Sequence, residues 1–534
     1  MNADTSLTTS IDQAKRLMVE GRDLPWLLRR QADSLPDKKF LIWEPFTAAT
    51  RSWTYAQFHA DVVALAGGLH SRGVGYGDRV MIHLDNSPEF MLSWFACAHL
   101  GAIAVSTNTR AVARDMTYYA EHAGITAAIT SPGHAQLVAD SAPDIELLAV
   151  TDNDAGEPGD VPAGIAHVPF AELLSDATPP PPDRVADPMA DLGIQFTSGT
   201  TSRPKAVLWT HANAIWGAEV NVAHMRLQPD DVTLLFLPLF HTNAQSYSML
   251  ATLWAGGSIV LQPRFSASRF WDVSLRNGVT WCSLIPFCVK ALQSSEVPAD
   301  HLYRFWGCGA QLPEVEAMFG IKTLAWWGMT ETITHGIIGS LEQPGPRMWI
   351  GRPSPAYDIS IRRPDGTPIA AGERGELFIR GVRGVSLFKE YYRNAPATAD
   401  AFDDDGWFDT GDLISMDDAG NLFFSDRSKD MLKVGAENVA ASEIETVIMH
   451  TRLVAECAVV GQRHAMLDEV PVAFVIPRQP APPDLAELVI AACRQDLADF
   501  KVPRVVYVVD ELPRSTLEKI AKNELRQGLP VIEA

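Results

Sequence analysis

The residues best suited to chemistry form a polar run between two apolar stretches. Small or hydroxylated side chains stand at five consecutive positions: Thr197, Ser198, Gly199, Thr200 and Thr201. The apolar run 192–196 precedes them, and Lys205 and the apolar run 206–209 follow. Small side chains let backbone N–H groups converge on an anion, while hydroxyls and the lysine add donors and positive charge. The pattern predicts a phosphate-binding loop between two strands, with a flexible polar hairpin as the alternative.

The spacing differs from the G-x-x-x-x-G-K-[ST] loop of nucleotide hydrolases. Four further segments follow in a fixed order: 327–332 (WGMTET), 406–413 (GWFDTGDL), 426–430 (DRSKD) and 513–520 (PRSTLEKI). Together with the loop they resemble the adenylate-forming (ANL) superfamily of acyl-CoA synthetases, carrier-protein-loading adenylation domains and luciferases. The resemblance covers nearly the whole chain. Through TSGTTSRPK and GMTET, the sequence is most similar to carnitine-CoA ligase-type enzymes of the AMP-binding acyl-CoA synthetase group.

The resemblance implies a site for ATP and Mg²⁺. The loop and Lys205 would bind the triphosphate, and Glu331 would ligate Mg²⁺, a hard cation that prefers oxygen ligands. The rest of the nucleotide would contact Gly309, Ala310, Gln311, Trp327, Gly328, Met329, Thr330, Asp412 and Arg427. Trp327 replaces the family's tyrosine, and its indole can still stack on adenine. Asp412 would accept hydrogen bonds from the ribose hydroxyls. The alternatives are a solvent-facing Glu331 and a turn-capping Asp412.

The resemblance also implies how a carboxylic acid is activated. Its carboxylate must attack the α-phosphorus of ATP, so the protein must align two anions and offset their charge. Lys519 would bridge the carboxylate and the α-phosphate, and His241 would form a gate beside them. The acyl group would contact His241, Asn243, Trp306 and Trp326. Further tryptophans nearby in sequence favour a bulky, hydrophobic acid, although tryptophans usually belong to cores: Trp209, Trp254 and Trp281.

A second half-reaction is expected after a domain movement. Lys429 matches the hinge about which the family's small domain turns, and a hinge absorbs a large change in backbone angles. The thiol of coenzyme A would then attack the acyl-adenylate. Gly435 and Ala436 would line the channel that admits the thiol arm of coenzyme A.

Glu518 departs from the family pattern, which has glycine before the catalytic lysine. At ~5 Å and an effective dielectric constant of about 20–80, its carboxylate would repel the phosphates by roughly 0.8–3 kcal/mol. That energy corresponds to about 4- to 200-fold in rate. Three alternatives to an ordinary acyl-CoA ligase stay open. They are a ligase that mainly thioesterifies a supplied acyl-adenylate, a carrier-protein loading enzyme and a non-catalytic nucleotide-binding regulator.

Composition limits the partners and the compartment. The 534 residues carry a net charge of −21, which argues against nucleic acid, because phosphate backbones need clustered Lys and Arg. The expected partners are a small carboxylic acid or its adenylate, ATP or AMP, and CoA, with a homodimer open as an assembly. The six cysteines form no C-x-x-C pair, and no apolar stretch reaches the ~18 residues of a membrane span. We expect a cytoplasmic protein with reduced thiols.

Helical and strand patterns alternate along the first part of the chain. Predicted helices at 58–70, 89–100 and 116–122 precede predicted strands at 79–84, 102–106 and 127–130. This alternation predicts an α/β fold of parallel sheets covered by helices. Strands at 359–362 and 375–379 predict a β-rich subdomain.

The end of the chain shows an independent α+β pattern. We predict helices at 441–450 and 484–500 and strands at 456–460, 470–476 and 505–509. The predicted domains are an AMP-binding N-terminal domain, 1–428, and a small mobile C-terminal domain, 429–534.

Overall fold

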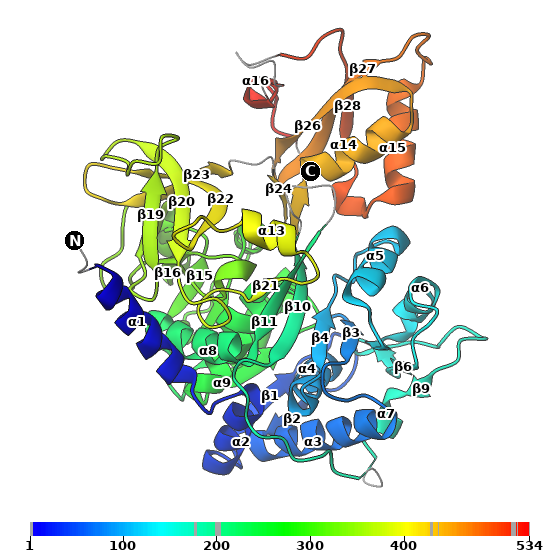
Figure 1. Ribbon diagram of the computed structural model, residues 1–534, viewed down its shortest axis with the longest axis vertical. Helices are drawn as coiled ribbons and strands as arrows, with labels where there is room; N and C mark the ends of the chain where they lie inside the picture. The colour runs from blue at the N-terminus through cyan, green and yellow to red at the C-terminus, as the bar shows by residue number, and fades with distance from the viewer. Residues whose placement is uncertain are drawn as a thin grey trace.

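The computed structural model describes residues 4–532 apart from 176–178, 198–203, 428–430, 436, 514–519 and 521. Within this part of the chain, strands form two large sheets and a smaller C-terminal sheet (Figure 1). No helix among these residues has both the length and the apolar character that a membrane crossing requires. The predicted α/β class is confirmed, with helices packed between and around the sheets.

The first large sheet has eight strands in the described part. In spatial order they are β21 (Glu390–Tyr391), β11 (Lys205–Thr210), β10 (Asp191–Thr197), β4 (Ile103–Ser106), β3 (Arg79–His83), β5 (Ala127–Thr130), β6 (Leu147–Val150) and β9 (Val168–Pro169). Strands β10, β4, β3, β5 and β6 run parallel, as the sequence predicted. The connecting helices include α3 (Tyr55–Ser71), α4 (Pro88–Leu100) and α5 (Ala113–Ala123).

Local sequence sets the ends of these helices. Thr54 and Gln57 form a capping box at the start of α3, because each side chain accepts a hydrogen bond from the other residue's backbone N–H. Ser87 caps α4 by accepting from the N–H of Phe90. Gly101 ends α4 in the left-handed region, at φ 71°, where glycine avoids the steric clash of a side chain.

The second large sheet has a parallel half and an antiparallel half. The parallel half, with β2 on its edge, comprises β16 (Lys322–Trp327), β15 (Phe305–Cys308), β14 (Trp281–Ser283), β12 (Val232–Leu235), β13 (Ser258–Leu261), β1 (Lys39–Trp43) and β2 (Arg51–Thr54). The antiparallel half comprises β19 (Asp358–Arg362), β20 (Arg374–Arg380), β22 (Trp407–Met416), β23 (Leu422–Arg427), β18 (Trp349–Pro353) and β17 (Ile337–Ile338). This antiparallel half is the predicted β-rich subdomain.

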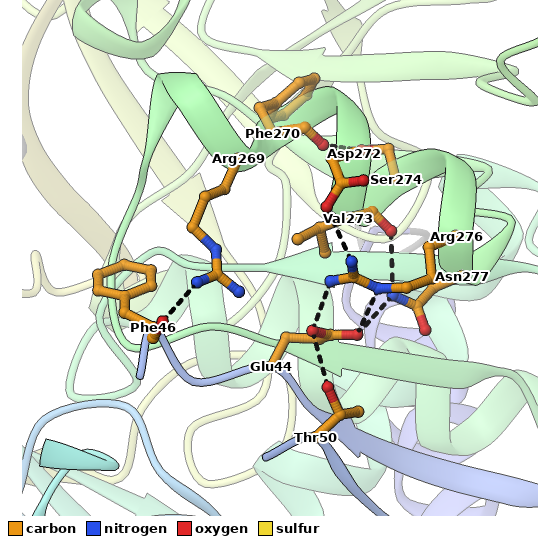
Figure 2. A network of polar contacts seen from close by, with 10 residues as sticks. All are labelled: Glu44, Phe46, Thr50, Arg269, Phe270, Asp272, Val273, Ser274, Arg276 and Asn277. Carbon is orange, nitrogen blue, oxygen red and sulfur yellow. Dashed lines mark hydrogen bonds and ion pairs between the residues drawn. The ribbon is translucent and has the colours of Figure 1, made fainter. Parts of the chain in front are cut away.

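A buried carboxylate ties this sheet to helix α10 (Ala267–Asn277) (Figure 2). Glu44, only 1% exposed, accepts hydrogen bonds from Arg276 at 2.7 and 3.2 Å and from Asn277 at 2.9 Å. Thr50 donates a further bond at 3.1 Å. Burial raises the pKa of Glu44, but these donors more than offset it and leave the pKa below its ordinary value of 4.5. Glu44 is therefore an ionised structural group.

The C-terminal part packs as a unit with its own core (Figure 1, orange and red). Its elements are β24 (Met431–Val434), β25 (Glu437–Ala440), α14 (Ala441–His450), β26 (Val454–His464), β27 (Asp468–Pro477), α15 (Leu485–Asp496) and β28 (Val505–Val508). The order matches the prediction, but the second helix is shorter, because Leu497 adopts an extended backbone. The predicted boundary at 428/429 lies outside the described residues.

Candidate active site

A cavity of about 830 Å³ lies where the two large sheets meet the C-terminal unit. Many of the predicted site residues line it: Thr197, Lys205, His241, Asn243, Gly309, Ala310, Trp326, Trp327, Gly328, Met329, Thr330, Glu331, Asp412 and Gly435. Most of them come from the ends of β10, β11, β15 and β16, from β22, and from the turn between β24 and β25, while the others come from the segments before and at the start of η2 (Asn243–Leu250) and from η3 (Thr330–Thr332). The fold thus gathers motifs that are hundreds of residues apart in sequence.

The predicted loop connects two paired strands. β10 and β11 are antiparallel, with Thr197 opposite Lys205, as expected for strands that flank a loop. The Lys205 ammonium lies 4.3 Å from the ring centroid of Tyr391, within range of a cation–π interaction. The four predicted loop residues between these strands lie outside the described residues: Ser198, Gly199, Thr200 and Thr201.

Glu331 lies in a single helical turn, η3 (Thr330–Thr332), and is buried. Its Oε1 accepts a 2.9 Å hydrogen bond from the Tyr391 hydroxyl. Burial and the nearby Glu331 charge raise the pKa of Tyr391 well above its usual value, so this phenol stays a donor. Among the described residues, no group of three or more His, Cys, Asp or Glu side chains is arranged to hold a metal ion. Mg²⁺ commonly uses one or two carboxylates together with phosphate oxygens, and Glu331 fits that pattern.

Trp327 and Asp412 are joined in the cavity wall. The indole Nε1 of Trp327 donates to Oδ2 of Asp412 at 2.9 Å, and Asp412 is buried on β22. Strand β23 places the backbone of Arg427 opposite Asp412.

A Cβ added at Gly309 would meet no atom within 4 Å, so its backbone borders open space. A Cβ at Gly328, by contrast, would lie 2.4 Å from the Tyr247 hydroxyl.

A buried polar network under the cavity was not predicted. The Thr242 hydroxyl donates to the side-chain oxygen Oε1 of Gln195 at 2.8 Å and lies within hydrogen-bond distance, 3.0 Å, of the Thr330 hydroxyl. Gln195 in turn donates to Gln245 at 2.7 Å, and Gln245 donates to Ser106 at 3.1 Å. These bonds connect β4 and β10 with the helical segment η2 (Asn243–Leu250) and the turn at Thr330. They fix the two large sheets relative to each other at the site.

The C-terminal unit contributes a carboxylate that the sequence analysis missed. Oε2 of Glu437 lies 3.3 Å from Nε2 of His241, which belongs to the large N-terminal part. Burial raises the pKa of Glu437, but His241, Arg110 and Asn108 more than offset this, and the net pKa lies below the usual value. Its position two residues after Gly435, in VGAEN, was the available signal.

A second ionic contact joins the same two parts. Nζ of Lys501 lies 2.8 Å from Glu443 of its own unit and 3.5 Å from Asp115 of helix α5, and all three groups are buried. Burial lowers the pKa of Lys501, but the two carboxylates more than offset it, so the pKa is raised and the lysine is charged. Arg110 also lies over the Phe500 ring at 4.6 Å.

Two predicted site residues lie away from the cavity surface. Gln311 is fully buried and donates to Glu316 at 2.6 Å and to Thr323 at 3.1 Å. Trp306 is fully buried and packs on Phe319 at 4.9 Å between ring centroids. Neither residue lines the cavity, and Trp306 belongs to the main apolar core.

The predicted tryptophan wall is smaller than the sequence analysis expected. Trp209 and Trp281 are also core, and of the tryptophans near the motifs, Trp326 and Trp327 line the cavity. Several other predictions lie outside the described residues: Lys429, Ala436, Glu518, Lys519 and the side chain of Arg427.

Comparison with known proteins gives a consistent result. A family of AMP-binding enzymes matches residues 28–392, and the AMP-binding enzyme C-terminal domain matches residues 443–519. The crotonobetaine/carnitine–CoA ligase of Salmonella paratyphi C is 33% identical over 525 residues, 95% of this chain and 100% of that protein.

Two structures of o-succinylbenzoate CoA synthetase from Bacillus subtilis are similar to different degrees. A double mutant bound with its product analogue OSB-NCoA has a TM-score of 0.80 at 25% identity, covering 94% of this chain and 98% of that one. The complex of that synthetase with AMP has a TM-score of 0.67 at 26% identity, covering 95% and 98%.

Proposed function

The chain belongs to the AMP-binding enzyme family, and we propose that it converts a carboxylic acid through an acyl-adenylate to an acyl-CoA thioester. One observation carries this proposal: a single cavity holds Lys205, the buried Glu331 carboxylate and the Trp327–Asp412 pair. These groups suit a triphosphate, its cation and a ribose. The relatives are acyl-CoA ligases, so the carrier-loading, thioesterification-only and regulatory alternatives are not favoured.

In the first half-reaction the protein must align two anions. We assign Thr197 and Lys205 to the triphosphate, where the ammonium offsets negative charge, and Asp412 to the ribose hydroxyls. Glu331 would hold Mg²⁺, which neutralises phosphate charge when bound. Tyr391 positions both groups, because its ring lies under Lys205 and its hydroxyl donates to Glu331. By the family resemblance, Lys519 would align the carboxylate with the α-phosphate.

In the second half-reaction the thiol of coenzyme A attacks the acyl carbon, a C–S bond forms, and AMP leaves. The thiol proton needs an acceptor, and we assign it to His241 at the cavity wall. Glu437 would orient the imidazole from 3.3 Å. Because Glu437 belongs to the C-terminal unit, this pair forms only when that unit is docked as here.

The mobility of residues 429–534 about Lys429 is part of the proposal. The higher TM-score to the product-analogue complex, 0.80 against 0.67 for the AMP complex, supports an arrangement suited to thioester formation. The contacts of Glu437 and Lys501 across the two parts support it as well. We further propose a cytoplasmic location, Mg²⁺ dependence and a homodimer.

The test measures the two half-reactions separately across a panel of acids. ATP–pyrophosphate exchange reports adenylation, and thioester detection after addition of CoA reports the second step. Lys205→Ala and Glu331→Ala should each lower exchange at least about tenfold, equivalent to ~1.4 kcal/mol. Lys322→Ala is a matched control, because its ammonium donates to the Leu341 carbonyl oxygen at 2.9 Å near the surface and Lys322 lies outside the cavity lining. Unchanged exchange in both site variants would overturn the assignment.

Glu437→Gln tests the role of the carboxylate beside His241. It keeps the shape of the side chain but removes the charge that faces His241. Exchange should stay near the wild-type rate while thioester formation from a supplied acyl-adenylate falls about tenfold or more. Equal loss of both activities would contradict a role confined to the second step.

A further inference from the structure

Two adjacent tryptophans of β16, Trp326 and Trp327, line different parts of the cavity. Successive side chains of a strand point to opposite faces. Trp327 reaches Asp412 and packs with the antiparallel half of its sheet. Trp326 points the other way, toward Tyr247 and His335, with ring centroids 6.0 and 4.6 Å away. If Trp327 borders the nucleotide, Trp326 borders a separate compartment, whose other walls include Asn243 and Tyr247.

The Trp326 indole lies directly on Gly307 of the neighbouring strand β15. A Cβ built at Gly307 would be 1.6 Å from Cη2 of Trp326 and 2.3 Å from Cζ3. No other amino acid at 307 can coexist with this position of the indole. The aromatic ring therefore occupies the space that a side chain of β15 would otherwise fill.

The region behind Trp326 is packed. His335 stacks on the indole at an interplanar angle of 17° and is fully buried, and neither of its ring nitrogens has a hydrogen-bond partner within the described part of the chain. Trp326 also shares an apolar cluster with Trp281 and Phe305, which are fully buried. A ligand that enters the compartment therefore meets the indole as an end wall.

We infer that Trp326, seated on Gly307, is the floor of the acyl compartment and restricts the enzyme to short carboxylic acids. This inference rests on the proposed function and names its substrate class. It replaces the bulky acid expected from the number of tryptophans, since most of those tryptophans are core. A truncated side chain at 326 would extend the compartment to the face of His335.

The test compares a series of straight-chain acids from propionate to octanoate in ATP–pyrophosphate exchange. Wild-type protein should prefer the short acids. Trp326→Ala should raise the ratio of kcat/KM for octanoate over butyrate about tenfold or more, because each methylene that fits an apolar pocket is worth roughly 10-fold or above. Trp326→Phe, a smaller truncation, should shift the preference to intermediate lengths.

Trp281→Phe is the matched control, because Trp281 belongs to the same cluster but lies outside the cavity lining. It should leave the chain-length profile unchanged. Gly307→Ala should lower activity toward every acid, since its Cβ meets the indole, and Gly307→Ala with Trp326→Ala should restore it. AMP binding, measured by calorimetry, verifies that each variant is folded.

The outcomes separate this inference from the proposed function. If wild-type protein activates no acid in the panel or among aromatic and betaine-type acids, the proposed function fails. If it activates octanoate as well as butyrate, or if Trp326→Ala binds AMP but keeps the wild-type profile, the proposed function stands and Trp326 is not the floor. Failure of the double variant to recover activity would likewise overturn the contact with Gly307.

Discussion

The indole Nε1 of Trp327 donates a 2.9 Å hydrogen bond to Oδ2 of Asp412, although 85 positions separate the two residues. The tryptophan that replaces the family's tyrosine thus orients the carboxylate assigned to the ribose. Trp327→Phe keeps an aromatic ring but removes the donor. Hydrogen bonds to charged groups contribute about 1.5–3 kcal/mol, so we expect the KM for ATP to rise about tenfold or more.

Trp349→Phe is the control for this substitution. The indole nitrogen of Trp349 is buried and has no hydrogen-bond partner among the described residues, so its removal loses no such bond. Steady-state kinetics at varied ATP should leave Trp349→Phe near the wild type. An unaltered KM in Trp327→Phe would show that Asp412 does not depend on the indole.

The Asp115–Lys501 contact should influence only the half-reaction that uses the docked arrangement. Asp115→Asn removes one of the two carboxylates around a buried ammonium and leaves Glu443 in place. The docked state should weaken, because Asp115 is the partner from the other part of the chain. We expect slower thioester formation, about three- to tenfold, with adenylation unchanged. Asp140→Asn on the exposed surface of α6 (Ala135–Ser141) is the control, and a uniform effect on both steps would count against the idea.

Much of this arrangement could be predicted from the sequence. Through the family resemblance, the motifs placed Thr197, Lys205, Glu331 and Asp412 at one site, and all four line the cavity. Glu437 was missed although it stands in VGAEN, since its partner His241 belongs to another unit and their meeting depends on docking. Trp306 and Trp326 lie on neighbouring strands. The alternation of side chains along a strand does not by itself say which of the two alternating sets faces a cavity. The hydrogen-bond network around Gln195 and Gln245 could not be predicted, because its partners lie far apart in the sequence and leave no local sequence pattern.

Glu44 should make the stability of the fold depend on acid pH. Its folded pKa lies below the ordinary 4.5, so the unfolded chain takes up the proton first as the pH falls. The stabilisation is complete above the unfolded pKa and is lost as the pH falls through the folded one. Glu44→Gln should lower the free energy of unfolding by about 1–3 kcal/mol at pH 7 and by progressively less below pH ~4.5.

Urea unfolding at a series of pH values measures this difference. Asp272→Asn is the control, because Asp272 pairs with the same Arg276 but its side chain is 70% exposed. Exposed pairs contribute about 0–1 kcal/mol, so the control curve should follow the wild type. A Glu44→Gln deficit that stays constant down to pH 3 would contradict the assignment of an ionised Glu44.

The glutamate before the predicted catalytic lysine supplies a test based on sequence alone. If the Glu518 charge opposes the α-phosphate, Glu518→Gly should raise ATP–pyrophosphate exchange by roughly 4- to 200-fold. Thioester formation from a supplied adenylate should change little. Glu518→Gln distinguishes charge from backbone freedom, because rescue by glycine alone would indicate a conformational need for glycine. Rapid exchange in the wild type that Glu518→Gly leaves unaltered would exclude any such repulsion.

The cavity takes its walls from two large sheets and a separately cored C-terminal unit. Catalytic activity therefore depends on how these parts of the chain are docked together, and no single core provides it. Mild heat or low urea should undock the C-terminal unit and abolish thioester formation while circular dichroism still reports full secondary structure, since local opening requires less free energy than global unfolding. Inactivation of this enzyme should consequently precede its melting, and recovery on cooling should be as fast as redocking rather than refolding.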